Sequence, residues 1–388
     1  MDDTADGGSL FQATGWAQRL LARVGWSVDS AGTSRRAAFL LWALVLVPPL
    51  VLSLWHGTAW GQAVDVPFLR DFDALARLGV VVPILVLASR LIGVRLGVAL
   101  QYLDETSLVP DTGTAEYKDA RQDLGRRVGS GTVTVIVLVL AILASGFVFL
   151  GSSNAGPTEH SNWIVDPSGG LTLAGWWYTL FSRTVISFLL LLWAWRYIAW
   201  WLFLRRLAKT ELRIIAVHPD RAGGLIPLVQ AHVSFVLLGI ALNTALSGAM
   251  ANELLHQGMT AAEALPEVAF FTILSAFLLF APLTVFVPGL LKAKFSDLVE
   301  YGRLGHDLSL DFDARWADGG SNLLDTADPS ALADFGADYD IVRGLHVFPI
   351  GRHQLAVIGL LLFAPFAALV LTQISLTELV RGLISRAF

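Results

Sequence analysis

Residues 132–150 read TVTVIVLVLAILASGFVFL, a run without a single charged side chain. About 20 apolar residues in helical form match the hydrocarbon core of a bilayer, which is roughly 30 Å thick. Lipid offers the backbone no hydrogen-bond partners, so a chain that crosses it must bond internally as a helix. This run therefore predicts a transmembrane helix.

The same kind of block recurs along the chain. We predict spans at 37–55, 78–100, 132–150, 176–204, 228–249, 268–291 and 354–372, and the second is interrupted by Arg90 and Arg95. The 388 residues are 55% hydrophobic and 15% charged, whereas soluble domains have about 25% charged residues. The predicted fold class is an all-α polytopic transmembrane bundle of about seven spans, with a small cytoplasmic helical layer.

Basic residues divide unequally between the loops on the two sides of these spans. Nineteen Lys and Arg lie on the side of the N-terminus, and Arg70, Arg381 and Arg386 lie on the other. Loops rich in Lys and Arg stay in the cytoplasm. The sequence therefore predicts that the N-terminus is inside and the C-terminus outside.

The polar segments divide the chain into four parts. Residues 1–36 predict an amphipathic cytoplasmic helix, which lies either on the membrane surface or on the protein itself. Residues 37–291 carry six spans and the cytoplasmic loops 101–131 and 205–227. Residues 292–353 form an acidic cytoplasmic helical segment, and 354–388 the last span with a short tail. Because loop 205–227 is basic, we expect it to dock against segment 292–353, with at least one ion pair between them.

Ionisable and polar residues inside spans are candidates for function, because burying them in lipid is costly. Arg183 lies seven residues, roughly 10 Å, from the outer aromatic residue Trp176 and is the hardest to explain by contact with headgroups. Asn243 is either its hydrogen-bond partner or a link between helices. Arg90 is close enough to the inner face to reach lipid headgroups, and we expect Arg196 to extend there as well. Prolines in several spans are expected to kink their helices for packing, and the pair Pro48-Pro49 is the best candidate for a helix break instead.

The most distinctive polar motif is HPDRAGGL, residues 218–225, in the basic loop before the fifth span. We expect Pro219 to end the preceding helix, Asp220 to accept backbone N–H bonds, and Gly223 or Gly224 to adopt positive φ. Free amides beside Arg221 would suit an anion, and His218 a metal or a proton. The alternative is a hydrogen-bonded helix entry with no ligand.

Several chemistries are disfavoured. The chain has no Cys, and its net charge of −5 does not suit nucleic acid. His306 with Asp311, and Glu253 with His256, have spacings seen in enzymes but lack the other residues those sites need. No catalytic residue, metal site or cofactor is predicted, and the only partner that the sequence implies is the lipid bilayer; a homo-oligomer or membrane partner stays open.

Four stretches resemble a family of bacterial polytopic inner-membrane proteins for which no activity is established. They are HPDRAGGL (218–225), FAPLTVFVPGLLKAKFSDLVEYG (280–302), DFDARWADGG (311–320) and LLDTADPSALADFGADYDIVRGLHVFPIGR (323–352). The resemblance covers about 205–388. In that family the segment near 325–334 is closer to GSADIQSLADLG, from which Asp325, Thr326, Pro329, Ser330, Ala331 and Phe335 depart. The resemblance implies the bacterial cytoplasmic membrane and supplies no site residue.

Two functions fit these features. The spans, prolines and Arg183 favour a permease or channel-like protein. The alternative is a membrane-embedded scaffold or sensor that works through its cytoplasmic loops; a lipid-modifying enzyme is disfavoured. A polar cavity at mid-membrane would support the first, and a sealed bundle under an ordered cytoplasmic layer the second.

Overall fold

The computed structural model describes residues 31–153, 161–166, 170–317 and 328–373. Within these ranges the chain is an all-α bundle without a β-strand, and two isolated bridges, Val66–Asn162 and Val165–Leu171, join loops at one end. The predicted fold class is confirmed. The amphipathic segment predicted at 1–36 lies outside the described residues except for 31–36, which begin the first helix.

The helices follow the predicted spans, and several extend beyond them. Their bounds are α2 Ala31–Trp55, α3 Phe72–Leu75, η3 Ala76–Val81, α4 Val82–Glu105, α5 Thr114–Val128, α6 Gly131–Ser153, α7 Leu173–Trp177, η5 Tyr178–Ser182, α8 Arg183–Leu207, α9 Ile226–Val233, α10 Val236–His256, α11 Ala261–Phe280, η6 Ala281–Phe286, α12 Val287–Ala317, α13 Asp328–Arg343 and α14 Arg352–Gln373. Segments η3 and η5 are π-helical, and η6 is a 3₁₀-helix.

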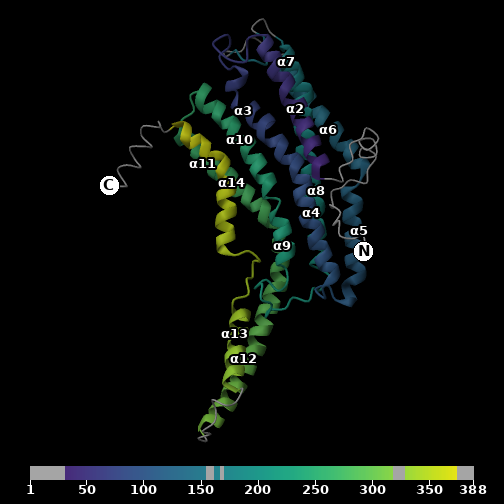
Figure 1. Ribbon diagram of the computed structural model, residues 1–388, viewed down its shortest axis with the longest axis vertical. Coiled ribbons are helices and arrows are strands. Elements are labelled where there is room, and N and C mark those ends of the chain that lie inside the picture. The colour runs from purple at the N-terminus through teal and green to yellow at the C-terminus, as the bar shows by residue number, and fades with distance from the viewer. Residues whose placement is uncertain (1–30, 154–160, 167–169, 318–327, 374–388) are drawn as a thin grey trace, which may run out of the picture.

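Six helical stretches in the described residues are long and apolar enough to cross a membrane. They correspond to the first six predicted spans, so the chain is a multi-pass integral membrane protein. The apolar part of α14, Arg352–Ala367, is shorter, and α14 packs along α10 and α11. Successive long helices alternate in direction, and α14 runs alongside them (Figure 1).

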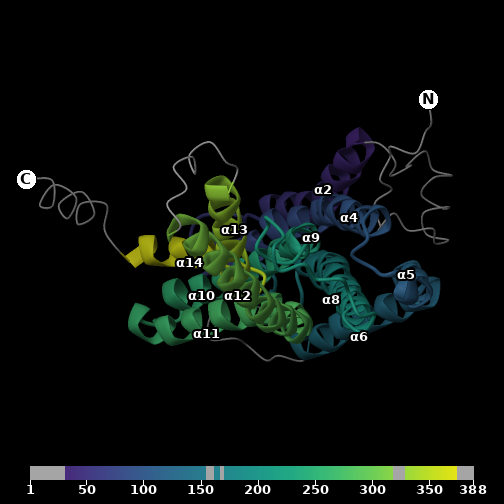
Figure 2. The ribbon, with the colours of Figure 1, turned by 90° about the horizontal axis from the view of Figure 1, so that it is seen from below.

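The bundle has two sides that meet at α9. Seen from the hairpin end, α10, α11 and α14 lie on one side and α4, α5, α6 and α8 on the other (Figure 2). Large side chains fill the space between them. Fully or almost fully buried aromatic residues at the centre are Trp193, Trp200, Phe203, Phe235 and Phe286. The interior of the bundle is therefore packed with apolar groups.

Helices α12 and α13 form a hairpin that projects well beyond the bundle (Figure 1). Helix α12 has 31 residues, a length of roughly 46 Å at 1.5 Å per residue. The two helices pack through Tyr301 and Phe335, whose rings stack with centroids 5.8 Å apart, while Gly305 leaves room for the Phe335 ring. The predicted apolar face of α13 is largely present: Leu332, Phe335 and Tyr339 are half-buried and Val342 is buried, whereas Ala331 is exposed.

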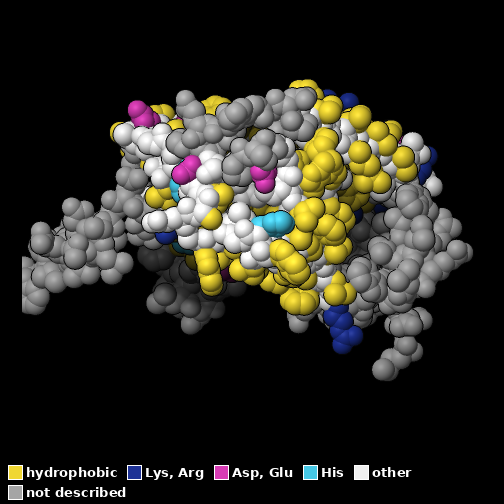
Figure 3. Space-filling view, turned by 90° about the horizontal axis from the view of Figure 1, so that it is seen from above, with side chains coloured by type: hydrophobic (Ala, Val, Ile, Leu, Met, Phe, Trp, Pro, Cys, Tyr) yellow, Lys and Arg dark blue, Asp and Glu magenta, His cyan; other side chains and the backbone are white. Residues whose placement is uncertain are grey.

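The opposite end of the molecule is different in character. In the view from above, hydrophobic side chains dominate the visible described surface and Lys and Arg appear only near its rim (Figure 3). This is the end at which α2 finishes and α7 begins (Figure 1). The loops rich in Lys and Arg and the loops poor in them thus lie at opposite ends of the bundle.

The best candidate for a helix break, Pro48-Pro49, does not break its helix, because α2 continues through both prolines to Trp55. A helix loses one backbone bond at each proline, and here side chains of the fourth span bond the freed carbonyls: Nε1 of Trp177 donates to Leu44 at 3.3 Å and Oγ of Ser182 to Val45 at 2.9 Å. The described helices break elsewhere. Helix α9 ends at Val233 before α10 begins at Val236, and the sixth span changes to 3₁₀ winding over Ala281–Phe286, around Pro282.

Candidate functional site

The turn 218–225 is organised around the side chain of Asp220. Its carboxylate accepts the backbone N–H groups of Ala222 at 2.8 Å, Gly224 at 3.1 Å and Ile226 at 3.3 Å. Ile226 is the first residue of α9, where a helix has N–H groups without intrahelical partners. Asp220 therefore bonds both the turn and the first N–H of α9, where the fifth span begins. The prediction that Asp220 accepts backbone N–H bonds is confirmed.

His218 contributes to the same network. Its Nδ1 lies 2.8 Å from Oδ1 of Asp220 and 3.3 Å from the backbone N of Asp220. Burial alone would raise the pKa of Asp220, but the three backbone amides and His218 outweigh it and hold that pKa below its ordinary value. The carboxylate occupies the place that an external anion would take among these amides, which favours the structural interpretation of the motif.

The backbone of the turn requires left-handed conformations. Gly223 and Gly224 have φ of 67° and 89°, as predicted, and Arg221 has φ of 52°. A Cβ on Gly223 would lie 2.3 Å from Cγ2 of Ile214, so glycine also permits close packing there.

The expectation that Pro219 ends the preceding helix is wrong, because α8 already ends at Leu207. Residues 208–217 instead pass over loop 106–113, where the N–H of Arg213 donates to the carbonyl of Leu108 at 2.8 Å.

The turn also holds the base of the hairpin. The carbonyl of Arg221 accepts the N–H of His346 at 2.9 Å, and Nζ of Lys294 donates to the carbonyl of Leu345 at 2.8 Å. Arg221 reaches Gly344, close to the end of α13. Loop 205–227 and segment 292–353 thus dock as predicted, but the described contacts between them are the bonds of His346 to the carbonyl of Arg221 and packing, rather than the expected ion pair.

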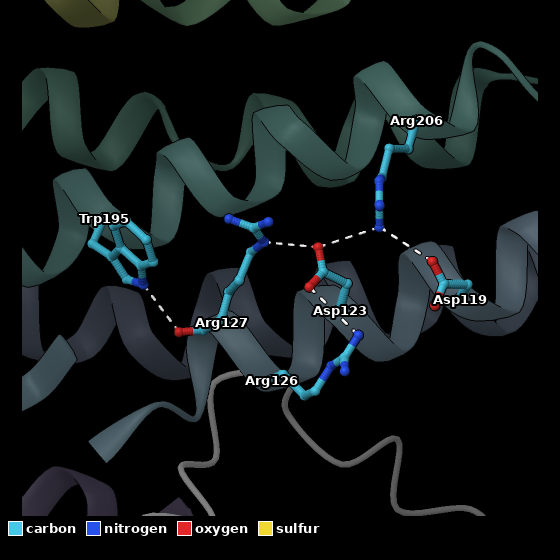
Figure 4. Close-up of polar contacts among 6 residues, drawn as sticks. All are labelled: Asp119, Asp123, Arg126, Arg127, Trp195 and Arg206. Carbon is cyan, nitrogen blue, oxygen red and sulfur yellow. Dashed lines mark hydrogen bonds and ion pairs between the residues drawn. The ribbon is translucent and has the colours of Figure 1, made fainter. Parts of the chain in front are cut away.

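Arg206 of the basic loop pairs with helix α5 instead. Its Nη1 lies 3.3 Å from Asp123 and 3.4 Å from Asp119 (Figure 4). Nε of Arg127 donates to Asp123 at 2.8 Å, and Nε1 of Trp195 donates to the carbonyl of Arg127 at 3.0 Å. The hydrogen bond from Arg127 is the main reason that the pKa of Asp123 lies below its ordinary value. These contacts fix amphipathic α5 along the lower half of α8.

A polar cavity of about 510 Å³ lies beside the hairpin base, between residues 208–214 and the start of α12. Its lining includes the cations Arg213 and Lys292 and the carboxylates Glu211 and Asp297, so the charges balance. In the described residues no group of three or more His, Cys, Asp or Glu side chains is placed to hold a metal ion. Taken together, the turn, the hairpin base and this cavity form a junction between the bundle and the hairpin.

The intramembrane candidates do not join this junction. Asn243 is fully buried; its Nδ2 donates to the carbonyl of Leu362 and its Oδ1 accepts from Oγ of Ser275, both at 2.8 Å. It links α10, α11 and α14, the second of the two predicted roles. Arg183 is half-buried, with its guanidinium 5.8 Å from the ring centroid of Tyr178, and Arg90 is exposed on the flank of α4.

The expectation that Arg196 extends to the headgroups is wrong. Arg196 is 8% exposed, its Nη1 donates to Oγ of Ser89 at 3.0 Å, and its guanidinium lies 5.1 Å from the ring centroid of Trp193. Sequence position alone placed this residue one turn from an aromatic belt but did not show that it faces α4. A polar contact and a cation–π contact within the bundle hold it there.

Sequence reasoning missed a second polar cluster at the break in the sixth span. Pro282 has no N–H to bond the carbonyl of Leu278, and the hydroxyl of Tyr197 donates to that carbonyl instead. Nε2 of His232 bonds the next carbonyl, Leu279, at 2.6 Å, while its Nδ1 accepts from Nε1 of Trp200 at 3.1 Å. Because Nδ1 accepts, Nε2 carries the proton. The proline marks the freed carbonyl in the sequence, but its partners come from other spans.

Another buried carboxylate lies near the opposite end. Asp71 accepts the N–H of Ala74 at 3.0 Å, Nδ2 of Asn252 at 2.8 Å and Nε1 of Trp163 at 2.7 Å. It caps α3 and joins the first outer loop to α10 and to the segment before α7. Its three donors give it a structural role in closing this end of the bundle.

Comparisons with protein-family models, curated proteins and solved structures find no match to the chain. The fold and the spans define its class, a multi-pass α-helical integral membrane protein. Any more specific function has to be inferred from the junction and the hairpin.

Proposed function

We propose that the protein is a membrane-embedded scaffold that presents the α12–α13 hairpin to a soluble partner in the cytoplasm. The observation that carries this proposal is the continuity of the sixth span with the hairpin. Segments α11, η6 and α12 follow one another without an intervening loop, from one end of the bundle to the tip of the hairpin. The turn 218–225 then holds the base of the hairpin against the bundle.

An exposed apolar strip on α12 supplies a docking surface. Val299 and Leu310 are 75% and 55% exposed, and eleven residues make close to three helical turns, so they share a face with Phe295. Leu310 lies eighteen residues beyond Lys292, roughly 27 Å along the helix, and is therefore well clear of the lipid. Exposed apolar side chains in a row commonly mark sites of protein contact.

The proposal includes an orientation and a location. The loops rich in Lys and Arg lie at the hairpin end, so the positive-inside rule supports a hairpin and an N-terminus in the cytoplasm, with the C-terminus outside. The resemblance of residues 205–388 to bacterial inner-membrane proteins supports the bacterial cytoplasmic membrane.

A permease is the second candidate function, supported by the breaks in the fifth and sixth spans. The carbonyls at the sixth-span break are bonded to Tyr197 and His232, which weakens their use as ion ligands.

Photo-crosslinking in living cells tests the scaffold directly. A photoreactive residue at Leu310 should give discrete adducts with soluble proteins, recovered in the membrane fraction with the protein itself, because that side chain lies in the strip. Ala337 on α13 is exposed but outside the strip, and the same residue there should give few or none. Adducts of equal yield at both positions, or none at Leu310, would argue against a docking role for the strip.

A further inference from the structure

A groove of about 850 Å³ opens on the flank of the bundle, between α4, the α9–α10 break and α14. Its lining is mostly apolar, with Leu91, Val94 and Val98 from α4, Leu237 from α10, and Val357 and Leu361 from α14. All three walls come from membrane-facing elements, so the groove adjoins lipid rather than the hairpin junction. Its walls have the character of a site for a hydrocarbon chain.

The groove also holds one cation, Arg95, and one imidazole, His353. Arg95 lines it from α4 and His353 from α14, and its lining contains no Asp or Glu. Both side chains are exposed, and among the described residues no acceptor is shown for either. A cation within or beside a span is costly unless an anion or water accompanies it. The protein thus supplies a cationic donor, Arg95, and the imidazole of His353 beside it, without a carboxylate in the groove lining for either.

The position of these two residues matches the inner membrane boundary. His353 is the second residue of α14, directly after the polar connection from the hairpin. Arg95 lies ten residues before the end of α4, and that end is fixed to α5 by the pairs of Asp104 with Arg121 and Tyr117. Gln230 and Gln354 also line the groove and offer further donors. Polar groups at the boundary correspond to the headgroup of a phospholipid, and the apolar walls above them correspond to its acyl chains.

We propose that this groove binds a phospholipid of net negative charge from the surrounding bilayer. The phosphate accepts hydrogen bonds from Arg95 and His353, and an acyl chain lies along the walls formed by α4, α10 and α14. Arginine is well suited to this contact because its guanidinium offers several donors to phosphate oxygens. Anionic headgroups are enriched where basic side chains gather at the cytoplasmic surface.

Native mass spectrometry of the purified full-length protein tests the headgroup contact. Phosphatidylglycerol should bind more tightly than phosphatidylcholine, and the double variant Arg95→Gln, His353→Gln should lose that preference, with affinity for phosphatidylglycerol falling on the order of tenfold. Arg90→Gln is the matched control, because Arg90 is exposed on the same helix but does not line the groove. This control should bind phosphatidylglycerol as the wild type does.

A second variant tests the chain contact without changing charge. Val94 is 41% exposed and lines the groove, so Val94→Trp should fill part of it and weaken binding of both lipids. Circular dichroism and elution as a single species would establish that each variant is folded. The proposal is overturned if the double variant keeps the preference for phosphatidylglycerol, if Arg90→Gln abolishes it equally, or if Val94→Trp binds both lipids as tightly as the wild type.

Discussion

Replacing Asp220 with alanine should lower the free energy of unfolding by about 3 kcal/mol. The variant leaves three backbone N–H groups, those of Ala222, Gly224 and Ile226, without their acceptor, and the side chain that they lose is only 13% exposed. Hydrogen bonds to a charged acceptor contribute more than neutral ones. Chemical denaturation of the purified protein in detergent micelles measures the change.

Acidification provides an independent check on the same carboxylate. The folded-state pKa of Asp220 is depressed, so its contribution to stability is present above the ordinary pKa of an aspartate, about 3.9, and is lost as pH falls below it. Asp220→Asn should show a smaller loss of stability than the wild type over that range.

The control for Asp220→Ala is Asp338→Ala, at an exposed position on the hairpin, which should change stability by less than about 0.5 kcal/mol. An Asp220→Ala variant as stable as Asp338→Ala would show that the turn does not depend on this cap.

The largest single effect is expected at the break in the sixth span. His232→Ala removes a fully buried side chain that bonds both the carbonyl of Leu279 and the indole N–H of Trp200. Two buried polar groups then lack partners and a cavity opens between α8, α9 and α11. The expected loss in the free energy of unfolding is about 4 kcal/mol.

A second histidine provides the control for this prediction. His256 is half-buried at the opposite end of the bundle, and its bond to the carbonyl of Arg70, 3.0 Å long, is open to solvent. His256→Ala should therefore cost less than about 1 kcal/mol, because water replaces the lost bond. Equal effects of the two substitutions would contradict the role assigned to His232.

The sequence was informative wherever a local pattern determined the outcome. Spans followed from apolar runs, and the bonds of Asp220 and the positive φ of Gly223 and Gly224 followed from turn chemistry. Boundaries were less accurate: the second span was expected at 78–100, but the apolar helical stretch there runs from Phe72 to Glu105.

Pairings between distant residues could not be read from the chain. Trp200 and His232 are 32 positions apart, and His232 and Leu279 are 47 apart, so neither bond leaves a local pattern. Arg196 and Pro48-Pro49 were misjudged for the same reason. The direction in which Arg196 points, and whether a proline interrupts a helix, depend on the neighbouring helices.

The absence of cysteine from the sequence makes a direct test of the sealed bundle possible, because any introduced cysteine is the only thiol. Ala88, Ala199 and Ala241 lie in the buried core on α4, α8 and α10, and Ala337 is exposed on the hairpin. Each is changed to cysteine and exposed, in membranes open at both faces, to a thiol reagent that dissolves only in water. A scaffold with a filled interior predicts rapid labelling at Ala337→Cys and none at the three core positions. Labelling of the core positions at a comparable rate would reveal a water-filled path through the membrane, and would contradict the scaffold in favour of a permease.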